Sequence, residues 1–124
     1  MSYDLTLLRP PPGVDVADAL EQFYEEQTDD WPEQTVSPAE ERAFASLSAY
    51  AEVYRDGTFA LTVMLPFLAD PEQAAANLDG ALPYLHTLLG VGYVVDDPQQ
   101  GRLLSAEELG PLLRRVYVEG PGPE

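Results

Sequence analysis

The sequence YAEVYRDGTFALTVMLPF, residues 50–67, decides how the rest of the chain can fold. In its second half every other residue is a large apolar one, which is the period-2 pattern of a strand with one buried face. The apolar side of that strand consists of Phe59, Leu61, Val63, Leu65 and Phe67. Such a continuous apolar side is typical of a central strand, so we place a strand at 58–67.

The dipeptide Asp56-Gly57 lies between this strand and a second β-rich run that contains Tyr50 and Tyr54. Asp-Gly supplies the positive φ angles of a two-residue type I′ turn, which joins antiparallel strands. We therefore predict a hairpin whose first strand covers about residues 50–55. The alternative is a single helix that runs through Tyr54 and ends with Gly57 as its C′ residue.

The N-terminal part of the chain predicts a strand followed by two helices. The run Pro-Pro-Pro-Gly at 10–13 ends an alternating stretch, and Asp15 is an N-cap for the helical spacing that follows. Ser-Pro-Ala-Glu at 37–40 combines a Ser N-cap, Pro at N1 and Glu at N3, which is a capping box. We expect a strand at 2–9, a helix at 16–27, a loop at 28–36 and a helix at 38–48.

The C-terminal part contains two further helix starts. Asp-Pro-Glu-Gln at 70–73 opens a long helix that Gly80 and Pro83 should kink and that Gly90 ends. Ser-Ala-Glu-Glu at 105–108 opens a short helix that Gly-Pro at 110–111 interrupts. The remaining expectations are a strand at 91–95, a turn at 96–101 and a disordered Pro/Gly tail at 119–124.

In order, these elements form a β-α-β-β-α-β series with short extra helices. This order and the central hairpin predict an α+β fold of the ferredoxin-like, split βαβ type. We expect an antiparallel sheet with the helices on one face. Residues 1–118 should form a single domain.

The charge balance excludes whole classes of partner. The chain of 124 residues has six arginines, no lysine and 22 acidic residues, a formal net charge of −16. Binding to nucleic acid or to an anionic membrane needs clustered cations, so we expect neither. The longest mostly apolar run, 59–69, is too short to cross a bilayer, and the N-terminus lacks a basic signal region. We therefore expect a cytoplasmic protein.

Missing residue types exclude much chemistry. Without cysteine there are no disulfides, thiolate nucleophiles or iron–sulfur clusters, and without lysine there is no Schiff base and no P-loop. A single histidine, His86, cannot supply a zinc signature within one chain. We therefore expect no cofactor and no tightly bound transition metal.

Three segments carry a resemblance to known proteins. They are the opening Met-Ser-Tyr-Asp-Leu at 1–5, the strand and turn GYVVDDPQ at 92–99, and GRLLSAEEL at 101–109. Together they resemble a loose group of small uncharacterised bacterial proteins, some of which look like immunity proteins. The resemblance covers the first five residues and roughly the last third of the chain. The resemblance implies no particular activity and assigns no role to any residue.

The acidic stretch at 15–41 is the least ordinary feature, because it contains no basic residue. Its carboxylates are Asp15, Asp18, Glu21, Glu25, Glu26, Asp29, Asp30, Glu33, Glu40 and Glu41. With an exposed Trp31 at its centre, this surface would dock a cationic partner, the charges steering the encounter and the indole anchoring it. The alternatives are that Trp31 belongs to the core, and that the acidity serves solubility or adaptation to high salt.

Two further candidates have ordinary explanations beside the functional ones. Asp96 and Asp97 follow a strand. Carboxylates at such a position bind Mg²⁺ or Ca²⁺ in some proteins, but in others they only accept hydrogen bonds from the backbone of the turn. His86 lies on the second long helix, where a base would need a partner that the sequence does not identify.

The sequence favours a non-enzymatic, acidic protein-interaction module of the immunity or inhibitor type, with a basic protein as partner. The expected binding residues are Trp31, Asp29, Asp30, Glu33, Glu25 and Glu26. The alternative is a small-molecule-binding or cofactor-free enzyme domain with a pocket between sheet and helices, in which His86 or a tyrosine is the polar group. A third possibility is a purely structural acidic protein. Oligomeric state stays open.

Overall fold

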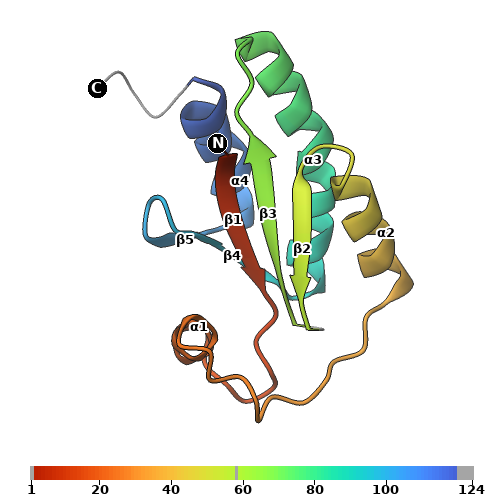
Figure 1. Ribbon diagram of the computed structural model, residues 1–124, viewed down its shortest axis with the longest axis vertical. Coiled ribbons are helices and arrows are strands. Elements are labelled where there is room, and N and C mark those ends of the chain that lie inside the picture. The colour runs from red at the N-terminus through yellow and green to blue at the C-terminus, as the bar shows by residue number, and fades with distance from the viewer. Residues whose placement is uncertain (1, 58, 120–124) are drawn as a thin grey trace.

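A computed structural model describes residues 2–57 and 59–119. Within these residues the chain forms an antiparallel sheet of five strands in the order β2-β3-β1-β4-β5, with four α-helices (Figure 1). The strands are β1 (Ser2–Leu8), β2 (Glu52–Asp56), β3 (Ala60–Pro66), β4 (Val94–Asp97) and β5 (Arg102–Leu104). The helices are α1 (Val16–Tyr24), α2 (Pro38–Leu47), α3 (Pro71–Val91) and α4 (Ala106–Leu113), which continues as the π-helical η1 (Arg114–Val118). The α+β class and the antiparallel sheet are confirmed.

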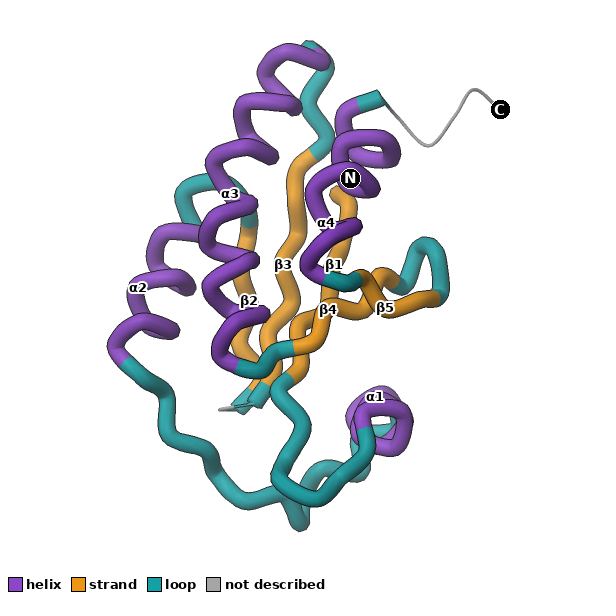
Figure 2. The backbone as a smooth tube through the Cα atoms, turned by 180° about the vertical axis from the view of Figure 1, so that it is seen from behind, coloured by secondary structure: helices purple, strands orange, loops and turns teal. Residues whose placement is uncertain are grey.

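Strand β1 is the centre of the sheet because it pairs with β3 on one side and with β4 on the other. Its odd-numbered side chains are buried and face helices α2, α3 and α4, which cover one face of the sheet (Figure 2). The sheet residues of this main core are Tyr3, Leu5, Leu7, Leu61, Val63, Leu65, Val95 and Leu104. The period-2 pattern of the sequence thus becomes one apolar layer under three helices.

The hairpin between β2 and β3 is confirmed, and the helical alternative for this stretch is wrong. Asp56 still belongs to β2 and pairs with Ala60, so the connection is residues 57–59 instead of the two-residue turn that we expected. Gly57 has a φ of +68°, the left-handed conformation for which glycine is suited. Residue 58 lies outside the described residues.

Helix α1 does not join the other helices, so the expectation of all helices on one face is wrong. It also ends at Tyr24, earlier than residue 27. Ala19 packs with Leu8 and Ala60 in a second, smaller core. Leu8 and Ala60 pair in register at one end of the sheet and point away from the main core. Alternation along β1 and β3 leaves these two apolar residues on the other face, and α1 covers them there.

The region after α3 differs from the expected strand at 91–95 and turn at 96–101. Val91 still belongs to α3, and β4 includes Asp97, which is completely buried. The turn is therefore shorter, and it leads into β5, a fifth strand that the sequence analysis missed. The ferredoxin-like prediction described a sheet of four strands, and the observed sheet has one strand more at the β4 edge.

Helix α4 runs through Gly110 and Pro111 without the predicted interruption. Leu109, Leu112 and Leu113 are all buried in the main core. Burying a leucine contributes about 1.5–3 kcal/mol, so three of them outweigh the roughly 3 kcal/mol that proline costs inside a helix. The predicted disordered tail falls, from residue 120 onward, outside the described residues.

Gly80 of α3 allows Tyr50 to lie directly against the helix. A Cβ atom added at Gly80 would overlap the Tyr50 ring, whereas one added at Gly90 of the same helix meets nothing within 4 Å. The Tyr50 ring is itself stacked on Tyr84, with the centroids 6.4 Å apart, and cannot easily move away.

We predict that Gly80→Ala lowers the free energy of unfolding, because the overlap with Tyr50 outweighs the roughly 1 kcal/mol by which alanine usually stabilises a helix over glycine. Gly90→Ala is the matched control and should leave stability unchanged or raise it. Urea denaturation of the two variants checks this. Equal gains in both would contradict the close packing of Tyr50 on α3.

Candidate functional site

Helix α1 and the loop that follows it carry eight of the ten carboxylates singled out in the sequence. We call residues 15–33 the acidic segment. Its exposed carboxylates are Asp15, Asp18, Glu21, Glu25, Glu26, Asp29, Asp30 and Glu33. The other two residues of the acidic stretch are engaged elsewhere: Glu40 is buried, and Glu41 forms an ion pair with Arg55.

The acidic segment is attached to the sheet through α1. Phe23 packs edge-on against Phe59, with the ring centroids 6.5 Å apart. The Tyr24 hydroxyl donates to a carboxylate oxygen of Asp96 on β4, at 2.5 Å. Burial, together with this hydrogen bond, raises the pKa of Tyr24 to about 12. Tyr24 therefore keeps its proton at neutral pH and ties α1 to β4.

Trp31 holds the loop of the acidic segment in place. Its ring meets Phe59 edge-on at a centroid distance of 4.9 Å, and its indole N–H donates to the side-chain oxygen of Gln22 at 2.8 Å. The side chain is half-buried in the smaller core, so only part of it is available to a partner. Around it lie Asp29, Asp30 and Glu33, all exposed.

The far end of the loop is fixed by Arg9, which follows β1. One guanidinium nitrogen donates to both carboxylate oxygens of Glu40, at 3.0 and 3.2 Å, and the other donates to the Thr35 carbonyl at 2.9 Å. The side chain of Gln34 donates back to the Arg9 carbonyl at 2.9 Å. The loop between α1 and α2 is therefore held by side-chain contacts at Trp31 and, further on, at Gln34 and Thr35.

Glu40 is the buried partner in this arrangement. Burial alone would raise its pKa, but hydrogen bonds from the Ser37 backbone N–H and the Tyr93 hydroxyl, together with the charge of Arg9, outweigh that effect and lower it. Burial and the same hydrogen bond raise the pKa of Tyr93. Glu40 is thus a charged carboxylate inside the protein, compensated by three donors.

The residues at the C-terminal end of α1 lower the stability of the folded protein. Glu26 has a φ of +58° at a position where glycine is preferred, and a non-glycine residue there costs about 1 kcal/mol. Glu25 and Glu26 also lie at the negative end of the helix dipole, and the last turn of α1 contains no basic residue. Folding alone therefore does not account for glutamates at these two positions.

The arginines lie on one side of the sheet, whereas carboxylates lie on both sides. Three of the six arginines belong to α2 or η1. The other three reach toward the helices from β2, from β5 and from the residue after β1. The six are Arg9, Arg42, Arg55, Arg102, Arg114 and Arg115. The face of the sheet opposite α2, α3 and α4 has carboxylates and, among the described residues, no cationic side chain.

The other predicted candidates lie apart from the acidic segment. Asp97 accepts hydrogen bonds from the Tyr3 hydroxyl at 2.6 Å and from the backbone and side chains of Gln99 and Gln100, so it is a structural carboxylate. Asp96 accepts from Tyr24 and faces away from Asp97. Among the described residues, no three aspartate, glutamate or histidine side chains are grouped as a metal site.

The predicted pocket residue His86 is exposed on α3. A hollow of about 320 Å³ does lie between α2 and α3, and Tyr84 lines it. Its other lining residues are Ala39, Arg42, Ala43, Ser46 and Thr87, and His86 is not among them. Of the two polar groups predicted for a pocket, a tyrosine therefore lines this hollow and His86 does not.

Sequence analysis missed the polar residues of the uncovered sheet face, among them Asp4, Glu52 and Tyr54. The available signal was alternation, because polar residues that alternate with buried ones along a strand share one face. The sequence does not show which face the helices leave open.

Comparison of the chain with family models, with curated proteins and with solved structures finds no match. Within the part of the chain that the structure describes, no helix has the length and apolar character needed to span a membrane.

We predict that Trp31→Ala lowers the free energy of unfolding by about 2 kcal/mol, less than the roughly 3–5 kcal/mol of a fully buried aromatic residue. Trp31→Phe keeps the contact with Phe59 and loses only the hydrogen bond to Gln22, so its loss should be about 1 kcal/mol. Chemical denaturation measures both. A loss below about 0.5 kcal/mol for Trp31→Ala would instead mean that the indole is free to anchor a partner.

We predict that Glu40→Gln lowers stability by about 3 kcal/mol at neutral pH, because it leaves Arg9 without its charged partner. The pKa of Glu40 is lowered from its ordinary value of 4.5 by folding, so its contribution is complete above pH 4.5 and disappears as the pH falls through the lower, folded-state value. The difference between the wild type and Glu40→Gln should therefore shrink below pH 4.5.

The control for this experiment is Glu41→Gln, which removes an exposed ion pair with Arg55 and should cost less than about 1 kcal/mol. Denaturation curves between pH 3 and pH 7 supply the comparison. A difference for Glu40→Gln that stays constant over this range would contradict a buried, ionised Glu40.

Proposed function

We propose that the protein is a non-enzymatic, acidic interaction module of the immunity or inhibitor type, and that it binds a basic protein through the acidic segment. The observation that carries this proposal is that the arginines lie on one side of the sheet only, while carboxylates lie on both. The arginines gather on the side of α2, α3 and α4, and within residues 2–57 and 59–119 the carboxylates of residues 15–33 form no ion pair with them. A surface of one sign attracts partners of the opposite sign and speeds their encounter.

The geometry of the segment supports this proposal in two ways. First, Glu25 and Glu26 occupy positions that disfavour stability, which is typical of residues kept for a purpose other than folding. Second, Trp31 and Arg9 hold the segment in one shape, so its carboxylates are presented in a fixed arrangement. A preorganised surface loses less entropy when it binds.

We infer in addition that β1, α2, β2, β3, α3 and β4 form a ferredoxin-like core to which α1, β5 and α4 are added. The position of β1 between β3 and β4 and the hairpin of β2 and β3 support this inference. Helix α2, on the covered face, then provides the first crossover and α3 the second. Folds of this type serve many purposes, so the proposed function depends on the surface alone.

The test compares two variants with the same loss of charge. One carries Asp29→Asn, Asp30→Asn and Glu33→Gln in the acidic segment. The control carries Glu72→Gln, Glu107→Gln and Glu119→Gln, three exposed residues outside that segment. Binding partners are captured from a lysate of the natural host with the wild-type protein, and their association rates are then measured with all three proteins.

We predict a basic partner whose association slows about tenfold with the acidic-segment variant and changes less than about twofold with the control. The salt dependence of the association rate should become flatter only for the acidic-segment variant. Captured partners that are no more basic than the host's proteins in general would contradict the proposal. Equal effects of the two variants would also contradict it.

A further inference from the structure

The sheet has an uncovered face beyond the area that α1 occupies. Even-numbered residues of β1, β2, β3 and β4 point to this face, which lies toward the viewer in Figure 1. We call the part formed by β2, β3 and the start of β1 the open face. It includes Tyr54, whose side chain is 58% exposed although it is a large aromatic residue.

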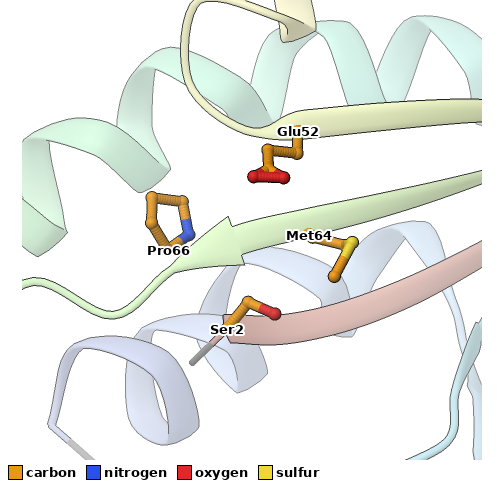
Figure 3. Close-up of a pocket in the computed structure, with 4 residues that line it drawn as sticks. All are labelled: Ser2, Glu52, Met64 and Pro66. Atoms are coloured by element: carbon orange, nitrogen blue, oxygen red, sulfur yellow. The ribbon is translucent and has the colours of Figure 1, made fainter.

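A hollow of about 190 Å³ lies on the open face, lined by Ser2, Glu52, Met64 and Pro66 (Figure 3). This volume corresponds to about six water molecules at about 30 Å³ each, which is the room that one long side chain needs. The thioether of Met64 and the ring of Pro66 supply its apolar part, and the Glu52 carboxylate lies between β2 and β3 beside them (Figure 3).

One carboxylate, Glu52, lines this hollow, and a second, Asp4, lies in the same row of residues. Glu52 pairs in register with Met64, and Met64 pairs with Asp4, so the three residues form one row across the strands. The Cα atoms of the outer two are therefore about 10 Å apart, twice the spacing of neighbouring strands. Hydrogen bonds hold both acids: the Tyr54 hydroxyl donates to Glu52 at 3.0 Å, and the Ser2 hydroxyl donates to Asp4 at 2.6 Å.

The arginines of the edge strands do not reach the open face. Arg55 of β2 points the other way, toward Glu41 and over the Phe44 ring at 4.6 Å. Arg102 of β5 pairs with Glu108 of α4. A second copy of this chain packed through the same face would therefore bring further carboxylates against Glu52 and Asp4, and charge complementarity favours a cationic surface there instead.

We propose that the hollow on the open face binds an arginine side chain of the basic partner. This proposal rests on the proposed function, because it requires such a partner. The methylene stem lies on Met64 and Pro66, and the guanidinium donates two hydrogen bonds to the Glu52 carboxylate. Tyr54 stacks against the planar guanidinium or the neighbouring partner backbone. A planar cation with a fork of donors fits a carboxylate beside an aromatic ring better than the compact ammonium of lysine does.

The probe for this proposal is a blocked pentapeptide with one arginine among glycines. Two matched peptides carry lysine or the neutral isostere citrulline in place of the arginine. Backbone amide signals of the protein and the methyl signal of Met64 are followed by NMR during each titration. The chain contains only two methionines, so selective methyl labelling gives a simple spectrum.

We expect the arginine peptide to shift the Met64 methyl and the amides near Ser2 and Glu52, with the lysine peptide binding several-fold more weakly and the citrulline peptide causing no shift. Glu52→Gln should weaken arginine binding about tenfold. Glu72→Gln, an equal charge change on α3, should leave it unchanged, and thermal denaturation should show both variants folded.

Shifts confined to residues 15–33 would overturn the arginine site while leaving the proposed function intact. So would equal shifts with arginine and citrulline, or no shift of Met64 at all. If the proposed function fails in the capture experiment but the arginine peptide still binds at Met64, the hollow recognises arginine without the acidic segment. The capture experiment therefore tests the proposed function, and the peptide titration tests the arginine site, and either proposal can be contradicted without the other.

Discussion

The buried Glu40 carboxylate joins three parts of the chain that are far apart in the sequence. Arg9 reaches it from the end of β1, Tyr93 reaches it from the start of β4, and Ser37 binds it at the first turn of α2. Because Arg9 also holds the Thr35 carbonyl, the same group of contacts fixes the loop between α1 and α2. The position of the acidic segment over the sheet therefore depends on a charge inside the protein.

The sheet determines where the charges of the surface lie. Alternation along β1 places Leu5 and Leu7 under the helices and Asp4 and Thr6 on the opposite side. The edge-strand arginines follow the same rule and point toward carboxylates of α2 and α4. With a net charge of −16, this arrangement leaves the opposite side strongly negative. One structural rule therefore produces both the apolar core and the surface on which the proposals rest.

The capping signals in the sequence predicted where the helices begin, whereas features that depend on distant partners were missed. The capping boxes at Ser37 and Ser105 are both present, because their bonds join residues three positions apart. The burial of Glu40 was missed because its partners are 31 and 53 residues away. In the site, the acidic residues were recognised from composition, but the half-buried position of Trp31 depends on Phe59, which the fold alone brings close.

The contacts that hold the acidic segment explain how it remains folded despite its own repulsion. Eight exposed carboxylates repel one another, and Glu25 and Glu26 add an unfavourable helix end. Against this act Ala19 in the smaller core, the indole of Trp31 and the Tyr24 hydroxyl bond to Asp96. All three lie on the inner side of the segment, so neutralisation of its outer side by a basic partner relieves the repulsion without breaking any of them. Binding of the proposed basic partner would therefore reinforce the folding of this segment, because it would remove the charge repulsion that opposes its structure.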